Sequence, residues 1–164
     1  MRALARIVCR TAWLAAALVV GTAIAAAAPG WVTTGRGPNV SAETASLARG
    51  SRLVLLCEER PRLHFRIPAT WDGRKIDGTF ITIDGERVPV TADGIDAAVV
   101  LSDLPNEAVG VSPALLSRME AARELVVAGP ATARIPLRQR SFSLEGAAPA
   151  IGRVKRVCPA GRRG

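Results

Sequence analysis

The stretch that decides the fold is TFITIDGERVPV, residues 79–90, in which two β-rich arms flank Asp84 and Gly85. An Asp-Gly pair between such arms favours a two-residue hairpin turn, because both central positions of that turn need positive φ. The turn sets a register that places Ile81 opposite Val88. Pro89 has no N–H to donate to a ladder, so we predict that the second arm lies at the edge of a sheet.

Two further strands are predicted before this hairpin. Residues 52–57 are nearly all apolar, which is typical of a strand covered on both faces, and they end at Cys57. In residues 63–67 apolar and polar side chains alternate, which indicates one buried and one polar face. The two segments are expected to form a second hairpin.

A helix is predicted over residues 113–128. Ser112 suits its N-cap, Pro113 its first position, and Gly129 the position just past its end. Apolar residues recur through this segment at helical spacing, so we expect one amphipathic helix laid on a sheet.

The other segments complete the predicted fold. A short strand is expected at 97–101, entered from a turn at Asp93-Gly94, and residues 131–137 and 141–144 suggest one interrupted strand or two short ones. Apolar residues at three-residue spacing before Cys158 suggest a short C-terminal helix; they are Ala148, Ile151, Val154 and Val157.

The order of these elements predicts an α+β fold with a mostly antiparallel sheet of about five to six strands and two helices. We expect a single domain over residues 51–158. Residues 28–50 contain several Gly and Pro breakers and suggest a flexible leader with one short edge strand near 42–47. Residues 159–164 are expected to be a disordered tail.

The first residues have the three zones of a secretory signal peptide. Arg2, Arg6 and Arg10 form a basic start, and an apolar run covers residues 14–28 with small residues at its end, where cleavage is expected after Ala25 or Ala27. A signal peptide at residues 1–27 predicts a periplasmic protein. The alternative is a retained N-terminal membrane anchor, because about 20 apolar residues can span a bilayer.

Cysteine usage agrees with export. Cys9 would be removed with the signal peptide, which leaves Cys57 and Cys158 for an oxidising compartment. With no third cysteine, one disulfide between them is predicted. It would close a loop of about 100 residues, for which chain entropy gives up to ~4.7 kcal/mol of stabilisation.

Charge is distributed unevenly along the chain. The 22 Lys and Arg residues fall to 19 without the three signal-peptide arginines, which against 14 Asp and Glu leaves a net charge of +5. Residues 72–107 hold eight acidic and three basic side chains, whereas residues 130–164 hold one acidic and eight basic. An acidic middle, with no Tyr and only six Trp and Phe, argues against nucleic-acid binding.

A basic end in the cell envelope predicts contact with an envelope protein or an anionic envelope surface. Charge that serves solubility alone is the other interpretation. The candidate contact residues are Arg134, Arg138, Arg140, Arg153, Lys155 and Arg156.

Catalytic and metal-binding patterns are weak. His64 is the only histidine, no Gly-x-Ser-x-Gly elbow occurs, and the cysteines lack the paired spacing of a zinc site. Most carboxylates of the acidic middle stand beside Gly, where short polar side chains form turns. We therefore predict a protein that is not an enzyme and that holds no cofactor or metal. The alternative function is an inhibitor of an extracytoplasmic hydrolase, such as a lysozyme or protease, acting through a loop at 71–78.

A pattern over residues 52–158 resembles small periplasmic proteins associated with type VI secretion, the VasI-like group. It comprises Leu53-x-Leu55-x-Cys57, Leu63-x-Phe65-x-Ile67, a central hairpin, a helix ending near Leu125, Phe142-x-Leu144-x-Gly146, Ala150-Ile151 and Cys158. The resemblance implies a non-enzymatic envelope protein with two bridged cysteines and no catalytic residues to carry over. The chain differs from that group in its lack of Tyr, in His64 and Arg66, and in the late position of Trp71.

Overall fold

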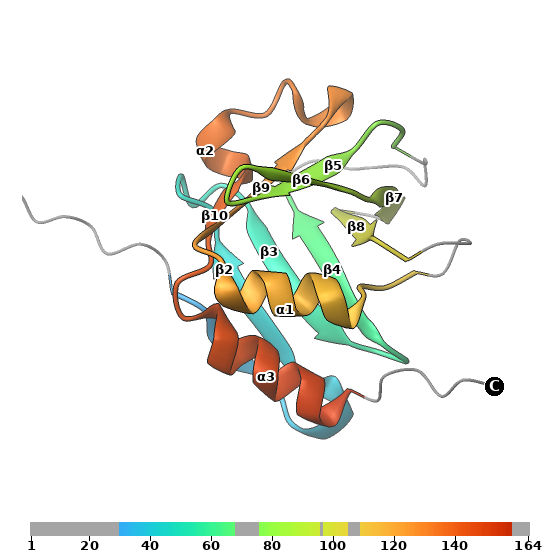
Figure 1. The fold of residues 1–164 in the computed structure, drawn as a ribbon, viewed down its shortest axis with the longest axis vertical. Coiled ribbons are helices and arrows are strands. Elements are labelled where there is room, and N and C mark those ends of the chain that lie inside the picture. The colour runs from blue at the N-terminus through green and yellow to red at the C-terminus, as the bar shows by residue number, and fades with distance from the viewer. Residues whose placement is uncertain (1–29, 68–75, 96, 105–108, 159–164) are drawn as a thin grey trace, which may run out of the picture.

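A computed structural model describes residues 30–67, 76–95, 97–104 and 109–158 of the chain. The predicted α+β class and antiparallel pairing are confirmed (Figure 1). The strands form two sheets, one of six strands and one of four, in place of the single sheet of five to six that we predicted.

The larger sheet has the strand order β1-β2-β3-β4-β8-β7. Its strands are β1 (Val32–Thr34), β2 (Ser41–Ala45), β3 (Arg52–Cys57), β4 (Pro61–Arg66), β7 (Thr91–Ile95) and β8 (Ala98–Ser102). The expected hairpin of β3 and β4 forms and occupies the centre of this sheet.

Two expectations about this sheet are corrected. Residues 30–50 do not form a flexible leader, because they contribute β1 and β2, and β2 pairs with β3 inside the sheet and not at its edge. Asp93 and Gly94 do not form a turn, because both lie within β7 and pair with β8. Burial alternates along β2 and β7, as expected for strands with one face on the core. The strands were not predicted because both segments are rich in polar residues.

The smaller sheet has the order β10-β9-β5-β6, and it is built on the Asp84-Gly85 hairpin. Its strands are β5 (Phe80–Ile83), β6 (Glu86–Pro89), β9 (Glu124–Ala128) and β10 (Ser141–Ser143). The hairpin register is confirmed, since Ile81 pairs with Val88. Both turn residues have positive φ, 49° for Asp84 and 83° for Gly85, and β6 lies at the sheet edge.

The predicted helix over residues 113–128 is too long. Its start is correct, because the Ser112 hydroxyl accepts a hydrogen bond from the Leu115 N–H at 3.0 Å. The helix α1 (Pro113–Ala121) then ends, and residues 124–128 form β9. The Asp84 carboxylate accepts hydrogen bonds from the backbone N–H groups of Arg123 and Glu124 at 3.0 and 2.9 Å, which fixes the chain as it enters the strand.

The segment after β9 also differs from its prediction. Residues 131–137 form no strand; a short 3-10 turn, η2 (Pro130–Thr132), leads to the one-turn helix α2 (Leu137–Arg140). Strand β10 falls within the predicted 141–144 segment. A second 3-10 turn, η1 (Gly37–Asn39), precedes β2.

The short C-terminal helix is confirmed as α3 (Ala147–Val157). Ile151 and Val154 face the core as expected. The other buried positions on this helix are Ala147 and Ala150, whereas Val157 is 37% exposed. The buried stripe therefore begins one residue earlier than predicted, at Ala147, and within the helix it ends at Val154.

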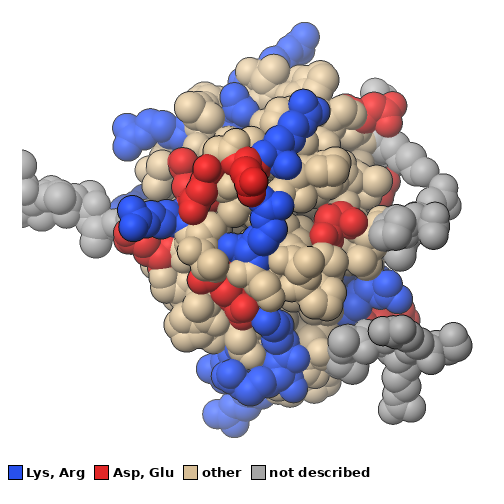
Figure 2. Space-filling model, viewed as in Figure 1, with Lys and Arg blue, Asp and Glu red and all other residues tan. Residues whose placement is uncertain are grey.

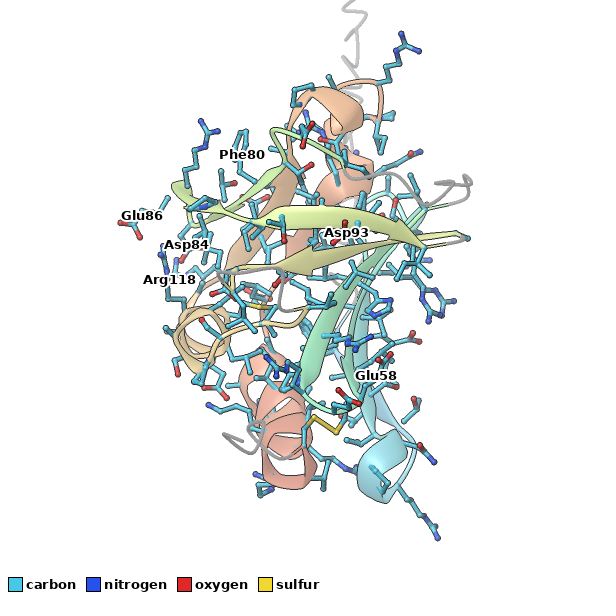
Figure 3. The ribbon with its side chains drawn as sticks, turned by 90° about the vertical axis from the view of Figure 1, so that its right-hand side faces the viewer. Glu58, Phe80, Asp84, Glu86, Asp93 and Arg118 are labelled. Atoms are coloured by element: carbon cyan, nitrogen blue, oxygen red, sulfur yellow. A yellow bond between two sulfur atoms is a disulfide. The ribbon has the colours of Figure 1, made fainter. Side chains whose placement is uncertain are left out.

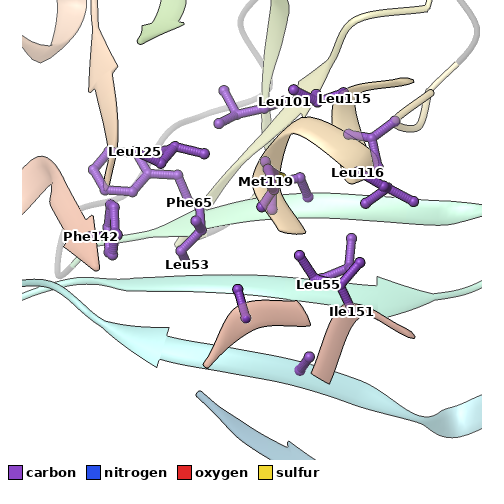
Figure 4. Close-up of a cluster of buried hydrophobic side chains, with 14 of the residues drawn as sticks. Leu53, Leu55, Phe65, Leu101, Leu115, Leu116, Met119, Leu125, Phe142 and Ile151 are labelled. Carbon is purple, nitrogen blue, oxygen red and sulfur yellow. The ribbon is translucent and has the colours of Figure 1, made fainter. Parts of the chain in front are cut away.

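The core lies between the larger sheet and a layer made of α1, α3 and the smaller sheet (Figures 1 and 4). Between these two layers, Phe65 of β4 and Phe142 of β10 meet edge to face, with ring centroids 5.8 Å apart. Within the described residues, no helix has the length and apolar character required to span a bilayer.

Candidate partner-binding surface

The six predicted contact residues fall into two groups that do not form one face. Arg134, Arg138 and Arg140 lie in or just before α2, whereas the other three lie on α3. The two helices are at opposite ends of the long axis of the molecule (Figure 1).

Two of the six cations are engaged within the fold. The Arg140 guanidinium donates to the backbone carbonyls of Ile135 and Val127, both at 3.2 Å, and so ties α2 to β9. The Lys155 ammonium pairs with Glu120 at 3.0 Å and so joins α3 to α1. Both side chains therefore have structural partners.

The remaining four cations are exposed arginines that form no ion pair among the described residues: Arg134, Arg138, Arg153 and Arg156. Basic side chains project at the upper end of the molecule, where α2 lies, and gather at the lower end, where α3 lies (Figure 2). The described part of the chain thus presents two separate groups of arginines that have no ion-pair partner within it.

The sequence did not indicate that the turn between β2 and β3 lies beside the α2 group of Arg134, Arg138 and Arg140. The turn between β2 and β3 packs against α2, because the Ala48 N–H donates to the Arg138 carbonyl and the Leu47 N–H to the Ser141 carbonyl, each at 3.0 Å. This turn adds an exposed arginine, Arg49, whose φ of 57° places its backbone in the left-handed region.

Exposed leucines accompany these arginines. Leu137 is 58% exposed and Leu47 is 37% exposed. We call the α2 patch the set of Leu47, Arg49, Arg134, Leu137 and Arg138. The sequence places each leucine within three residues of an arginine, but only the tertiary contact brings the two segments together.

The predicted disulfide is confirmed. Cys57 ends β3 and Cys158 caps the C-terminus of α3, with their Cα atoms 5.3 Å apart. Both cysteines are buried, and the bridge lies beside Glu58 (Figure 3). It fastens the end of α3 to the central strand of the larger sheet.

His64 is a buried residue in the centre of the larger sheet. It lies on β4 between Val54 and Val100, it is 9% exposed, and its ring forms no hydrogen bond with a described residue. Burial lowers the pKa of its imidazole, and the nearby Arg66 and Arg62 guanidinium groups lower it further against the opposing effect of Glu58. Burial therefore favours the neutral imidazole over the imidazolium.

This burial predicts a pH-dependent stability. Because the folded-state pKa of His64 lies below the ordinary value of about 6.5, the unfolded chain binds the proton more readily than the folded protein. Above that pH, protonation of His64 should have no effect on the free energy of unfolding. As the pH drops below it, we expect the free energy of unfolding to fall.

Urea unfolding of wild type and His64→Gln between neutral and mildly acidic pH measures this effect. The pH dependence should be shallower in the variant, because Gln does not titrate. Equal slopes in the two proteins would show that other groups cause the acid sensitivity.

The remaining sites from the sequence are structural or lie outside the described residues. Asp84 is held at the hairpin turn by backbone N–H groups, and Glu86 pairs with Arg118 on the same side (Figure 3). In the described ranges no three His, Cys, Asp or Glu residues are grouped to hold a metal. Residues 71–75 of the proposed inhibitory loop fall outside those ranges.

No protein family model, curated protein or solved structure matches the chain. The resemblance to the VasI-like group therefore remains a prediction from the sequence.

Proposed function

We propose that the chain is a non-enzymatic accessory or binding protein of the bacterial envelope, which acts in the periplasm after removal of residues 1–27. The observation that carries this proposal is the buried bridge between Cys57 and Cys158, because such bridges persist in oxidising compartments. The basic, apolar and small-residue zones of the first 28 residues supply a route to that compartment. The VasI-like resemblance agrees with this role.

The unpaired arginines at the two ends of the fold support binding to an anionic partner. Each one presents a charge that is not neutralised by a described carboxylate. Attraction between exposed charges is screened by salt over about 8–10 Å at physiological ionic strength. Binding through these residues should therefore weaken as salt rises.

Co-sedimentation of the exported protein with washed envelope fractions tests this function. We expect Arg134→Glu/Arg138→Glu or Arg153→Glu/Arg156→Glu to reduce the bound fraction, with the largest differences at low salt. Arg87→Glu/Arg123→Glu is the matched control, because it changes net charge equally at exposed positions outside both groups. Unchanged sedimentation in both test pairs, or an equal loss in the control, would contradict the proposal.

A further inference from the structure

We propose that the α2 patch is a docking surface for the anionic phospholipid headgroups of a membrane leaflet. In this arrangement Leu47 and Leu137 enter the headgroup boundary, and the arginines contact phosphates. The inference rests on the proposed envelope function, which supplies the membrane.

The patch is held together by the fold. The two hydrogen bonds from the Leu47 and Ala48 N–H groups fix the β2–β3 turn against α2 and β10. The side-chain amide of Gln139 lies against Gly50, which adds a second contact between the two segments. The hydrogen bonds from the Arg140 guanidinium to the Ile135 and Val127 carbonyls also attach α2 to β9. The backbone that carries the two exposed leucines is therefore held by hydrogen bonds to the rest of the fold.

The charged residues of the α2 patch are all positive. Residues 46–52 and 129–141 contain no Asp or Glu, and the three arginines of the α2 patch have no ion-pair partner in the described part of the chain. A basic surface close to an anionic leaflet gains about 1 kcal/mol for each Lys or Arg, which is about a fivefold gain in binding per arginine. Long arginine stems can also lie along apolar groups while their guanidinium ends stay hydrated.

The chemistry of the patch suits lipid better than protein. Energetically dominant residues of protein interfaces are enriched in Trp, Tyr and Arg that fill well-packed pockets. The two segments contain no aromatic residue, and their exposed apolar groups are two separate leucines. Aliphatic side chains rimmed by cations are instead the composition of surfaces that lie in the membrane interface.

The α3 group is less suited to this role. Its one exposed large apolar residue is Val157, at 37%, whereas Pro149 and Gly152 near Arg153 are small. Lys155 on this helix is already neutralised by Glu120. Arg153 and Arg156 also lie at the opposite end of the fold from the α2 patch (Figure 1).

The test is sedimentation of the exported protein with vesicles that contain phosphatidylglycerol and phosphatidylcholine, against vesicles of phosphatidylcholine alone. We expect binding only to the anionic vesicles. Arg49→Asn/Arg134→Gln/Arg138→Gln should weaken it on the order of 100-fold, and Asn is chosen because it tolerates the left-handed backbone at position 49. Leu47→Ser/Leu137→Ser leaves the charge unchanged and should weaken binding about tenfold.

Arg87→Gln/Arg123→Gln is the matched control and should keep wild-type affinity, because both side chains are exposed outside the α2 patch. Thermal melts confirm that each variant is folded. Binding to envelope fractions without binding to anionic vesicles would overturn the lipid inference and leave the proposed function in place. Loss of affinity in this control equal to that of the α2 variants would also overturn it, and binding to neither preparation would overturn both proposals.

Discussion

The Cys57→Ala/Cys158→Ala variant is expected to lose about 2–5 kcal/mol of its free energy of unfolding. The bridge joins residues 101 positions apart, so its removal releases a large loop in the unfolded chain. Domains of this size are stable by about 5–15 kcal/mol in total, and the loss is therefore a large fraction of the whole. Urea unfolding monitored by circular dichroism measures it.

The native state of this variant should remain folded, because Ile151 and Val154 also attach α3 to the core through their fully buried side chains. The change should concentrate at the end of α3, where the Cys158 N–H donates to the Val154 carbonyl at 2.8 Å. Hydrogen exchange at the last turn of α3 should accelerate more than exchange in β3. Adding reductant should destabilise wild type but not the variant, and two free thiols in the exported protein by mass spectrometry would contradict the bridge.

The sequence was most informative where local chemistry alone determines structure. The Asp84-Gly85 turn could be predicted together with its register, because few residues adopt positive φ and the flanking arms are β-rich. The helix start at Ser112 could also be predicted, since its hydroxyl forms a local cap. The disulfide could be predicted because Cys57 and Cys158 form a single pair once Cys9 is assigned to the predicted signal peptide.

The helix end could not be predicted, because a distant residue determines it. Leu125 and Val126 continue the apolar spacing of α1, and nothing between Ala121 and Leu125 breaks a helix. In the fold, β9 pairs with both β5 and β10, and Asp84 holds its first N–H groups. The ladder overrides helical propensity over residues 124–128, where two adjacent valines also favour a strand.

The candidate surface was predicted only in part for a related reason. A run of cations after residue 130 indicated one basic end, but β10 and the turn into α3 carry its two halves to opposite ends of the molecule. Arg140 and Lys155 looked like the other cations in sequence, and only their bonds to Val127 and Glu120 distinguish them. Arg49 could not be assigned to the group without the contact between the β2–β3 turn and α2.

Phe142→Ala is expected to cost about 3–5 kcal/mol of unfolding free energy. Phe142 is fully buried at 0% exposure and comes from β10 of the smaller sheet, where it meets Phe65 of the larger one. Its removal leaves a cavity between the two sheets as well as losing the transfer energy of the ring. Guanidinium unfolding at neutral pH should show this as a lower midpoint with an unchanged slope.

Phe80→Ala is the matched control, because Phe80 is half-buried on β5 and its ring is covered by the Arg87 guanidinium 3.8 Å away, on the outside of the fold. Deleting the same atoms there should cost about 1 kcal/mol. A double-mutant cycle with Phe65→Ala should then give about 0.5–1.5 kcal/mol of coupling for the edge-to-face pair. Because the pair joins β4 to β10, such coupling measures the strength of one direct contact between the two sheets. A Phe142→Ala cost as small as that of Phe80→Ala, with no coupling to Phe65, would show that the smaller sheet is held mainly by other contacts.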